Sequence, residues 1–494
     1  MAIATAVSRV AGFARIGVLI AALGLGTRLL DTYNVANTLP NAVFELVVGG
    51  AMASVVVPLL ARAAVTEADD GVVYAQRLLS LMVYGLSLVT VVAVVAAPWL
   101  VDALAPGFTG PQRHLAVVFS WYFLPQILAY GVGATAGAVL NMRGRFAAPA
   151  WAPLVNSLIV IAVGGVYLAI GGSTSIDGLM TVHLMLLALG TTAGVVGQTA
   201  LVVFALARSG FPLRLHLDPR GIAVRRIGRL GAWVLLSVLG AQVMLAAATR
   251  AASLSGPGGV TSYQTAYAIF QVPVAVIAMS VMTAMLPRLS RSAARRDHER
   301  VIGDLSLAVR VAAVALAPAA VGMLVLGRPF AALVFGEGRG VTMLGVVVAA
   351  FGPALLPFAA YTILQRGFYA LQDTRSPALI AAVVSIVGVA GCAAATWLLP
   401  AADIVVGVPL AYAAAYTVGL VATALVLRRR LGRIDGHRIV RTHAKVLVAA
   451  AVAGVGAALA GGVMTAVLAG LVGLVLYLAV AAALRLTELR QLRF

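Results

Sequence analysis

Long apolar runs recur along the whole chain and are separated by short polar segments. A run of about 20 apolar residues crosses the hydrocarbon core of a bilayer as one α-helix, because each residue adds about 1.5 Å. Backbone groups inside a bilayer must be paired internally, which favours helices over irregular chain. The pattern predicts fourteen spans, near residues 2–26, 33–61, 73–101, 114–141, 149–170, 179–207, 227–251, 261–287, 303–327, 340–365, 377–399, 403–427, 442–461 and 463–484. We therefore expect an all-α polytopic membrane protein with 14 transmembrane helices.

Composition supports the same class. Of the 494 residues, 62% are hydrophobic and 10% are charged, whereas a soluble domain carries about 25% charged residues. The net charge of +19 does not indicate a nucleic-acid partner, because the arginines occupy short loops between spans and not a soluble face. The single cysteine, Cys392, excludes a disulfide framework within the chain and a cysteine-ligated metal cluster.

Basic residues are distributed unevenly between the two sets of loops. With a cytoplasmic N-terminus, 27 of the 35 basic residues fall in inside segments and five in outside segments. The other three, Arg9, Arg15 and Arg310, fall within spans. Cytoplasmic loops are enriched in Lys and Arg, so we expect both termini in the cytoplasm. Arg15 would interrupt the apolar region of a signal peptide, and we expect the first segment to be a retained span.

The chain also repeats itself weakly. Three pairs of prolines in similar surroundings recur at steps of 229, 228 and 231, namely Pro58 and Pro287, Pro149 and Pro377, and Pro98 and Pro329. A nearly constant offset predicts two six-helix lobes in pseudo-twofold repeat, related by an axis along the membrane normal. Two lobes around a central site are a transporter layout.

This repeat leaves the last two spans outside the lobes. A linker that mixes "LRLHLDP" with "GIAVRRIGR" suits an amphipathic helix on the inner membrane surface. We expect an N-terminal lobe over 1–208, this cytoplasmic amphipathic linker over 209–226, a C-terminal lobe over 227–430, and helices thirteen and fourteen with a basic tail over 431–494.

The first span contains "SRVAGFARIG" and places two arginines in the membrane. Counted from Ala2, Arg9 lies about 10 Å deep and Arg15 about 20 Å deep. An arginine at mid-membrane costs about 2.5–3.5 kcal/mol on insertion scales. Arg9 can snorkel to the inner interface, whereas Arg15 is expected to face a water-filled cavity, on one stripe with Ser8 and Gly12. Guanidinium groups bind phosphate oxygens in bidentate fashion, so the pair favours an anionic, phosphorylated substrate.

Other polar positions near the spans are fewer. Asp31 and Glu45 flank the "LPN" that contains Asn41. Asp31 either lies solvated at the outer interface or belongs to the site. Glu45 is deeper and is expected to pair with a cavity arginine or to take up a proton. Arg250, near the outer end of the seventh span, either snorkels or points inward.

Several blocks carry a family resemblance: "SRVAGFAR", "NTLPNAVFELVVGGAMASVVVPLLAR", "GAVLNMRGRFAAPAWAPLVNSL", "AMLPRLSR" and "GFYALQDTRSP". In this order and on these spans, they resemble the MurJ/MviN family of lipid II flippases, within the multidrug/oligosaccharidyl-lipid/polysaccharide exporter (MOP) superfamily. The resemblance covers essentially the whole chain. It implies two lobes around a cationic cavity, with helices thirteen and fourteen forming a lateral groove for the polyprenyl tail.

The resemblance also implies roles for individual residues. Arg9 and Arg15 match the two first-helix arginines expected to engage the lipid diphosphate, Ser8 and Gly12 match their neighbours, and Asp31 matches an acidic position. Further cavity arginines of many members fall here at Phe44 and Ala268, so the cationic set is reduced. Arg250 is the candidate that compensates for them.

The resulting hypothesis is a flippase that moves lipid II, a polyprenyl diphosphate-linked disaccharide-peptide, from the cytoplasmic to the outer leaflet by alternating access. Its place would be the bacterial plasma (inner) membrane, with membrane lipids and cell-wall synthesis proteins as partners. Arg143 and Arg145 in "NMRGRF", and Asp373 and Arg375 in "ALQDTRSP", would belong to a cytoplasmic gate. We expect no enzyme activity and no cofactor. The coupling ion or membrane potential is left open.

Three alternatives stay open. The nearest is an exporter of the same superfamily for drugs or for another polyprenyl-linked glycan. A membrane enzyme acting on polyprenyl phosphates would need an acidic metal or base motif on an extramembrane loop, and the outer loops here are too short to hold one. A purely scaffolding protein would give no reason to keep Arg15 at mid-membrane.

Overall fold

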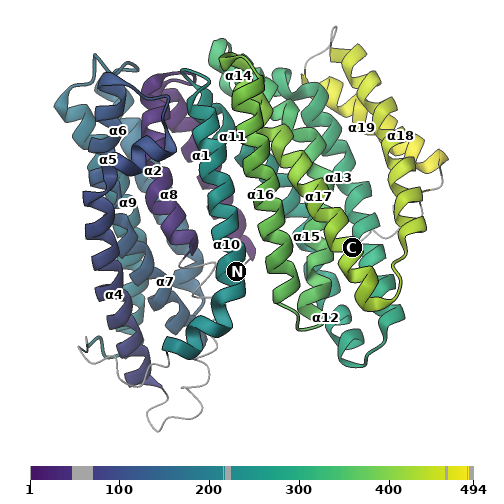
Figure 1. Ribbon diagram of the computed structural model, residues 1–494. Helices are drawn as coiled ribbons and strands as arrows, with labels where there is room; N and C mark the ends of the chain where they lie inside the picture. The colour runs from purple at the N-terminus through teal and green to yellow at the C-terminus, as the bar shows by residue number, and fades with distance from the viewer. Residues whose placement is uncertain are drawn as a thin grey trace. The chain divides into compact units, whose positions relative to one another are not determined.

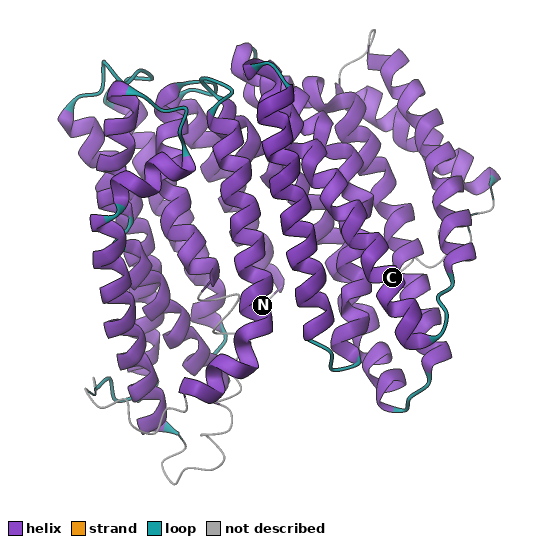
Figure 2. Cartoon of the chain, in the orientation of Figure 1, coloured by secondary structure: helices purple, strands orange, loops and turns teal. Residues whose placement is uncertain are grey.

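A computed structural model describes residues 2–46, 60, 71–214, 216, 224–461, 466–484, 486 and 488. Every regular element in these residues is a helix (Figure 2). Contacts divide the chain into two compact units, residues 1–242 and 243–494, with the boundary inside one long helix. The expected all-helical class is therefore confirmed.

In the described residues, the first unit contains eight helices and the start of a ninth. They are α1 (Ala2–Leu23), α2 (Arg28–Glu45), α4 (Val72–Val95), α5 (Ala97–Leu104), α6 (Gly110–Phe123), α7 (Gln126–Met142), α8 (Ala147–Ala169), α9 (Thr181–Arg208) and the first part of α10 (Val224–Ser253) (Figure 1).

The second unit begins with the end of α10. It continues with α11 (Gly259–Pro273), the π-turn η2 (Val274–Ala278), α12 (Met279–Ala294), α13 (His298–Phe335), α14 (Arg339–Phe351), the 3₁₀ turn η3 (Gly352–Ala354), α15 (Leu355–Ala370), α16 (Arg375–Leu398), the 3₁₀ turn η4 (Ala401–Asp403), α17 (Ile404–Leu431), α18 (Gly436–Gly461) and α19 (Ala466–Ala483).

Twelve helical segments among the described residues are long and apolar enough to cross a membrane. They coincide with the last twelve predicted spans. The first two predicted spans fall on α1 and α2, and residues 47–59 and 61 of the second lie outside the described part of the chain. Helix α2 begins at Arg28, before the predicted start at 33, because the Thr27 hydroxyl accepts a hydrogen bond from the Leu30 amide at 3.2 Å and caps the helix.

Three spans are broken at prolines that the sequence places inside them. Pro125 separates α6 from α7, Pro273 precedes the π-turn η2, and Pro353 lies in the 3₁₀ turn η3. Proline removes an amide donor and clashes with the preceding turn, so the ladder of hydrogen bonds is interrupted there. Pro40, in contrast, lies inside the continuous helix α2.

The described part of the linker differs from the amphipathic helix expected over 209–226. Residues 209–214 and 216 are not helical, while 215 and 217–223 lie outside the described residues and Val224 already opens α10. Gly210 has a positive φ of 78° and ends α9. Side chains of α4 then bind the extended chain, since Gln76 donates to the Pro212 carbonyl and Ser80 accepts from the His216 amide at 2.9 Å.

Small residues bring the helices around α1 close together. Helix α1 packs on α8, and α8 packs on α9. A Cβ on Gly164 of α8 would lie 2.6 Å from Val18 Cγ1 of α1. Close packing at small residues stabilises membrane helix pairs, and here it fixes the position of the helix that carries Arg15.

The last two helices pack as a pair against α13 (Figure 1). The Tyr477 hydroxyl of α19 donates a hydrogen bond to the Val314 carbonyl of α13 at 2.8 Å. Alanines and Tyr477 form the core of this contact with Val314. Helices α18 and α19 thus belong to the second unit, as an addition to its other helices.

Candidate functional site

Four of the predicted site residues lie on α1. The Arg9 side chain is exposed and that of Arg15 is half-buried. Among the described residues, neither guanidinium makes a hydrogen bond or an ion pair. The Ser8 hydroxyl is buried and has no partner there either. A Cβ on Gly12 would meet nothing within 4 Å, so the helix surface beside the arginines is open.

Arg15 lies near two tyrosine hydroxyls. The charge of Arg15 acts electrostatically on Tyr33 of α2 and on Tyr130 of α7. Tyr130 donates a hydrogen bond to Asn41 Oδ1 at 3.1 Å, and the Asn41 amide nitrogen donates to the Asn37 carbonyl at 2.8 Å. The structure therefore brings two predicted residues, Arg15 and Asn41, to one place through a tyrosine.

The two tyrosines were not singled out from the sequence. Tyr33 is buried, and its hydroxyl shares a hydrogen bond of 2.8 Å with Thr191 of α9. Tyr130 packs its ring against Phe44 at a centroid distance of 4.6 Å. A tyrosine inside an apolar span needs a hydrogen-bond partner for its hydroxyl. The position of these tyrosines within predicted spans could therefore have pointed to them from the sequence.

A cavity of about 430 Å³ begins at Tyr130. It lies within the first unit and is lined by Phe44, Tyr130, Gly133, Ala134, Gly137, Ala138, Asn141, Met142, Pro149, Ala152, Pro153, Gln198, Thr199 and Val202. Its wall is apolar apart from Tyr130, Asn141, Gln198 and Thr199. Because Asn141 and Met142 open the "NMRGRF" segment, the cavity extends from the neighbourhood of Arg15 to the predicted gate.

The two acidic candidates lie at opposite ends of α2. Asp31 is only 1% exposed, so the alternative of a solvated interface residue is wrong. Its place in the first helical turn is favourable, because a carboxylate there interacts with the positive end of the helix dipole. Glu45 ends the helix with an exposed side chain. It forms no ion pair with an arginine in the described chain, so the expected pairing is not observed there.

Arg250 lies in the second unit, in the last turn of α10. Its side chain is exposed, and its carbonyl accepts a hydrogen bond from the Ser253 hydroxyl at 2.7 Å. Ala268, the position expected to carry an arginine in many family members, lies in α11 of the same unit.

The first pair of gate residues occupies the turn between α7 and α8. Arg143 donates to the Ser209 carbonyl at 3.1 Å and lies over the Phe211 ring at 5.4 Å. Arg143 therefore ties this turn to the segment after α9. Arg145 is exposed, and no hydrogen bond or ion pair of its side chain occurs among the described residues.

The second pair occupies the turn before α16. Asp373 accepts hydrogen bonds from the amides of Arg375 and Ser376, both at 3.0 Å, and forms an ion pair with Arg430 at 2.9 Å. Partial burial raises the pKa of the Asp373 carboxyl, but the Ser376 hydrogen bonds and the Arg430 charge outweigh burial, so the pKa lies below its ordinary value. The carboxylate is charged at neutral pH and caps the first turn of α16.

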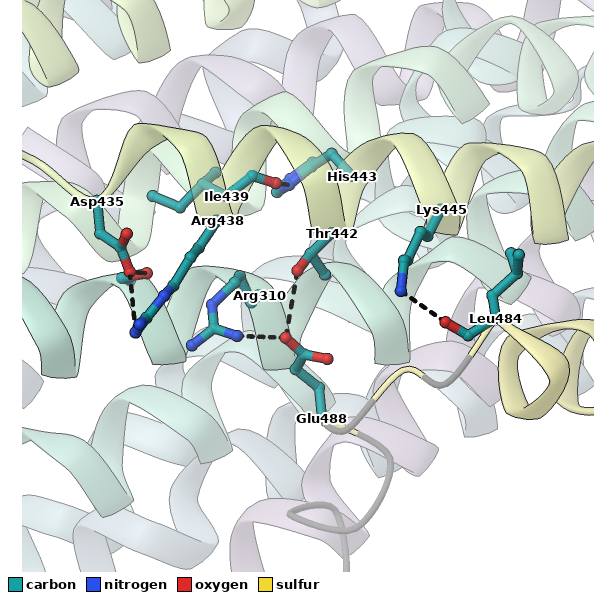
Figure 3. A network of polar contacts seen from close by, with 10 residues as sticks. Arg310, Asp435, Arg438, Ile439, Thr442, His443, Lys445, Leu484 and Glu488 are labelled. Atoms are coloured by element: carbon teal, nitrogen blue, oxygen red, sulfur yellow. Dashed lines mark hydrogen bonds and ion pairs between the residues drawn. The ribbon is translucent and has the colours of Figure 1, made fainter.

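Arg310, the third arginine predicted within a span, has a structural partner. Its guanidinium on α13 pairs with Glu488, whose carboxylate also accepts a hydrogen bond from Thr442 of α18 at 3.2 Å (Figure 3). Lys445, one turn along α18, donates to the Leu484 carbonyl at 2.6 Å (Figure 3). These contacts fasten α18 and the segment after α19 to α13.

A second cavity of about 430 Å³ is almost wholly apolar. Helices α13, α15, α17 and α18 and the loop before α18 line it, with Ile302, Leu305, Ser306, Val309, Ala360, Leu364, Leu420, Val421, Ala424, Leu427, Leu431, Ile434, Asp435, Gly436, Ile439, Val440, His443, Ala444 and Leu447. The polar groups Ser306 and Asp435 bond to each other at 2.9 Å, and His443 Nδ1 bonds the Ile439 carbonyl at 2.8 Å, so the other lining side chains are apolar. Such a surface suits a hydrocarbon chain.

No group of three or more His, Cys, Asp or Glu side chains in the described residues could hold a metal ion.

Comparisons with known proteins agree on one family. The sequence model described as "Lipid II flippase MurJ" matches residues 20–478. A protein of Burkholderia cenocepacia named "Lipid II flippase MurJ" is 28% identical over 394 residues, which cover 78% of this chain and 74% of that protein. A "Probable lipid II flippase MurJ" of Rhizobium tropici is 28% identical over 460 residues, covering 91% and 84%.

Solved structures share the fold. A structure titled "Lipid II flippase MurJ, inward closed conformation" has a TM-score of 0.80 at 17% identity and covers 98% of both chains. An inward-facing multidrug resistance MATE family transporter of the MOP superfamily has a TM-score of 0.68 at 16% identity, covering 86% of this chain and 94% of that one.

Proposed function

Since this chain belongs to the lipid II flippase MurJ family, whose sequence model matches residues 20–478, we propose that it moves lipid II from the cytoplasmic to the outer leaflet of the bacterial plasma membrane. It would act as a transporter by alternating access, without covalent chemistry. The family membership supports the substrate. The single structural observation that carries the proposal is Arg15, a half-buried guanidinium of the predicted first span with no acidic partner among the described residues.

The chemistry of Arg15 fits a diphosphate. A guanidinium in a low-dielectric site needs a counter-charge, and a diphosphate supplies oxygens that accept two parallel hydrogen bonds. Arg9, two helical turns nearer the N-terminus, would bind the same group when it enters. Asn41 and Tyr130 offer uncharged donors and acceptors beside Arg15 for the sugar-peptide headgroup. Asp31 and Glu45 remain proposed groups for coupling transport to an ion.

The apolar cavity of the second unit fits the other end of the substrate. The free energy of a polyprenyl tail changes little when it moves from lipid to a wall of leucine, valine and alanine side chains, because both surroundings are apolar. Helix α18, which has no counterpart in the six-helix repeat, supplies a large part of this wall. We propose that the tail lies here while the headgroup is translocated.

The test is transbilayer movement of labelled lipid II in proteoliposomes. Arg15→Ala should lower the rate at least about tenfold, because a charge-assisted bidentate contact contributes about 1.5–3 kcal/mol. Arg15→Lys should retain part of the rate, since a lysine keeps the charge and loses the bidentate geometry. Arg339→Ala is the matched control, because Arg339 is an exposed arginine at the start of α14 without a hydrogen bond or ion pair in the described chain.

Two results would contradict the proposal. Wild-type protein that moves lipid II no faster than empty vesicles, under an imposed potential and ion gradients, would show that the substrate is wrong. Movement of lipid II with equal rates for wild type and Arg15→Ala would show that the substrate is right and that Arg15 has a structural role.

A further inference from the structure

A strongly basic pocket lies between α12 and α13, away from the residues proposed for transport. Its volume is about 740 Å³, and its lining residues are Arg288, Arg291, Ser292, Arg295, Glu299, Arg300, Gly303, Asp304, Leu307 and Arg310. Five arginines face two acidic residues. The pocket is thus a concave site with a net charge of three positive units.

Part of this charge is compensated within the protein. Arg310 pairs with Glu488, and Arg300 pairs with Asp297 at 3.1 Å. Glu299 is bound by Arg433 at 2.6 Å. These contacts hold the α13 side of the pocket in place. Because Glu299 is paired with Arg433, it does not pair with the remaining arginines of the pocket.

Two arginines of α12 and the arginine at its C-cap are left without such contacts. Arg288, Arg291 and Arg295 occupy positions i, i+3 and i+7, so they share one face of the helix. No hydrogen bond or ion pair of theirs occurs among the described residues. Asp304 lies in electrostatic range of Arg288 without forming an ion pair with it. Three guanidinium groups without an ion-pair partner among the described residues therefore line one cavity, over about 10 Å along the helix.

We propose that this pocket binds the headgroup of an anionic glycerophospholipid, with its phosphate on Arg288, Arg291 and Arg295. Guanidinium groups bind phosphate in bidentate fashion, and basic pockets between membrane helices bind phosphorylated headgroups. A lipid is favoured over a soluble anion because α12 is part of a membrane span, and the pocket lies at the end of that span, where the headgroups of a bilayer lie.

This site is independent of the proposed transport of lipid II. It contains none of the residues proposed for the diphosphate or the polyprenyl tail. Its ligand is a structural or regulatory lipid of the surrounding membrane. The pocket also lies in a predicted cytoplasmic segment, where the inner leaflet presents its anionic lipids.

Native mass spectrometry of the purified full chain tests the assignment. Phosphatidylglycerol is titrated at constant ionic strength, with phosphatidylethanolamine as the zwitterionic reference. The triple variant Arg288→Gln, Arg291→Gln and Arg295→Gln should weaken phosphatidylglycerol binding by about tenfold or more, since each arginine near an anionic surface contributes about 1 kcal/mol. Phosphatidylethanolamine binding should not change.

A matched triple variant separates the pocket from general charge. Arg428→Gln, Arg429→Gln and Arg441→Gln remove the same charge from exposed arginines of α17 and α18 that do not line the pocket. We expect this variant to retain wild-type affinity. Equal weakening in both triple variants, or none in either, would overturn the site.

Two further measurements complete the test. Displacement of phosphatidylglycerol by millimolar inorganic phosphate would overturn the lipid assignment in favour of a soluble anion. The single variant Arg291→Gln, whose side chain is exposed and whose loss leaves the fold intact, should weaken binding by a smaller factor of about three to five. An unchanged affinity of this variant would count against Arg291 as a contact.

Discussion

At the scale of single residues, the site is defined by what surrounds Arg15. An arginine at mid-membrane persists only where water, a counter-charge or a polar cavity lowers its cost. Here the neighbours are the hydroxyls of Tyr33 and Tyr130, which can orient dipoles towards the guanidinium but cannot neutralise it. A site with uncompensated positive charge attracts an anion more strongly than a site in which a fixed carboxylate neutralises the arginine.

Tyr130→Phe directly tests the role of a hydroxyl group beside Arg15. The variant keeps the ring against Phe44 and removes only the hydroxyl that donates to Asn41. A buried hydrogen bond contributes about 1 kcal/mol, so lipid II movement should slow by about fivefold. The measurement is the initial rate in proteoliposomes. Tyr84→Phe, an exposed tyrosine of α4, is the control and should keep the wild-type rate. A Tyr130→Phe rate equal to that of the control would remove this tyrosine from the site.

At the scale of elements, turns and helix ends are fixed by a few charged groups. Asp373 caps α16 and pairs with Arg430, while Arg143 ties the α7–α8 turn to the chain after α9. Each contact stays within one unit and leaves the neighbouring arginines, Arg145 and Arg375, on exposed turns. These contacts therefore hold both turns of the predicted gate in place within their own units.

Asp373→Asn should lower stability in a pH-dependent way. The pKa of Asp373 lies below its ordinary value in the folded state, so the carboxylate stabilises the fold at neutral pH. This contribution, about 0.5–1 kcal/mol because Arg430 is half exposed, is lost as the pH falls below about 4. Thermal unfolding in detergent should show a lower Tm for the variant at pH 7 and converging values at the lowest accessible pH. Asp403→Asn, at an exposed turn before α17, should show no such difference.

The attachment of α18 through Glu488 is a second element-scale prediction. Glu488 is 5% and Arg310 16% exposed, so removal of one partner leaves the other partly buried and unpaired. Glu488→Gln should destabilise the protein by about 2–4 kcal/mol, whereas the apolar double variant Arg310→Met with Glu488→Leu should recover most of the loss. Detergent unfolding gives both values. A double variant as unstable as Glu488→Gln would show that the charges have a role beyond their mutual pairing.

At the scale of the whole molecule, local patterns predicted the elements and missed the contacts between them. Apolar runs located the helices, because this effect acts within a few residues. The hydrogen bond from Tyr130 to Asn41 joins positions 89 residues apart, and the pair of Arg310 and Glu488 spans 178. Neither contact can be predicted from the pattern of neighbouring residues in the sequence. The contacts of Gln76 and Ser80 of α4 with residues 212 and 216 lack a local signature for the same reason.

Each compact unit has a proposed role of its own, and the two roles can be tested separately. The first unit offers the polar neighbourhood of Arg15, and the second offers the apolar cavity.

Ala424→Trp should fill much of the apolar cavity of the second unit, because the indole adds a large apolar volume where Ala424 lines the wall. Lipid II with a full-length polyprenyl tail should then move at least about tenfold more slowly, while an analogue with a short tail should move at nearly the wild-type rate, since only the long tail loses its apolar wall. Val455→Trp, on an exposed position of α18, should leave both rates unchanged. Equal slowing of both lipids by Ala424→Trp would mean that the cavity supports the fold or the conformational change, and that the tail travels elsewhere.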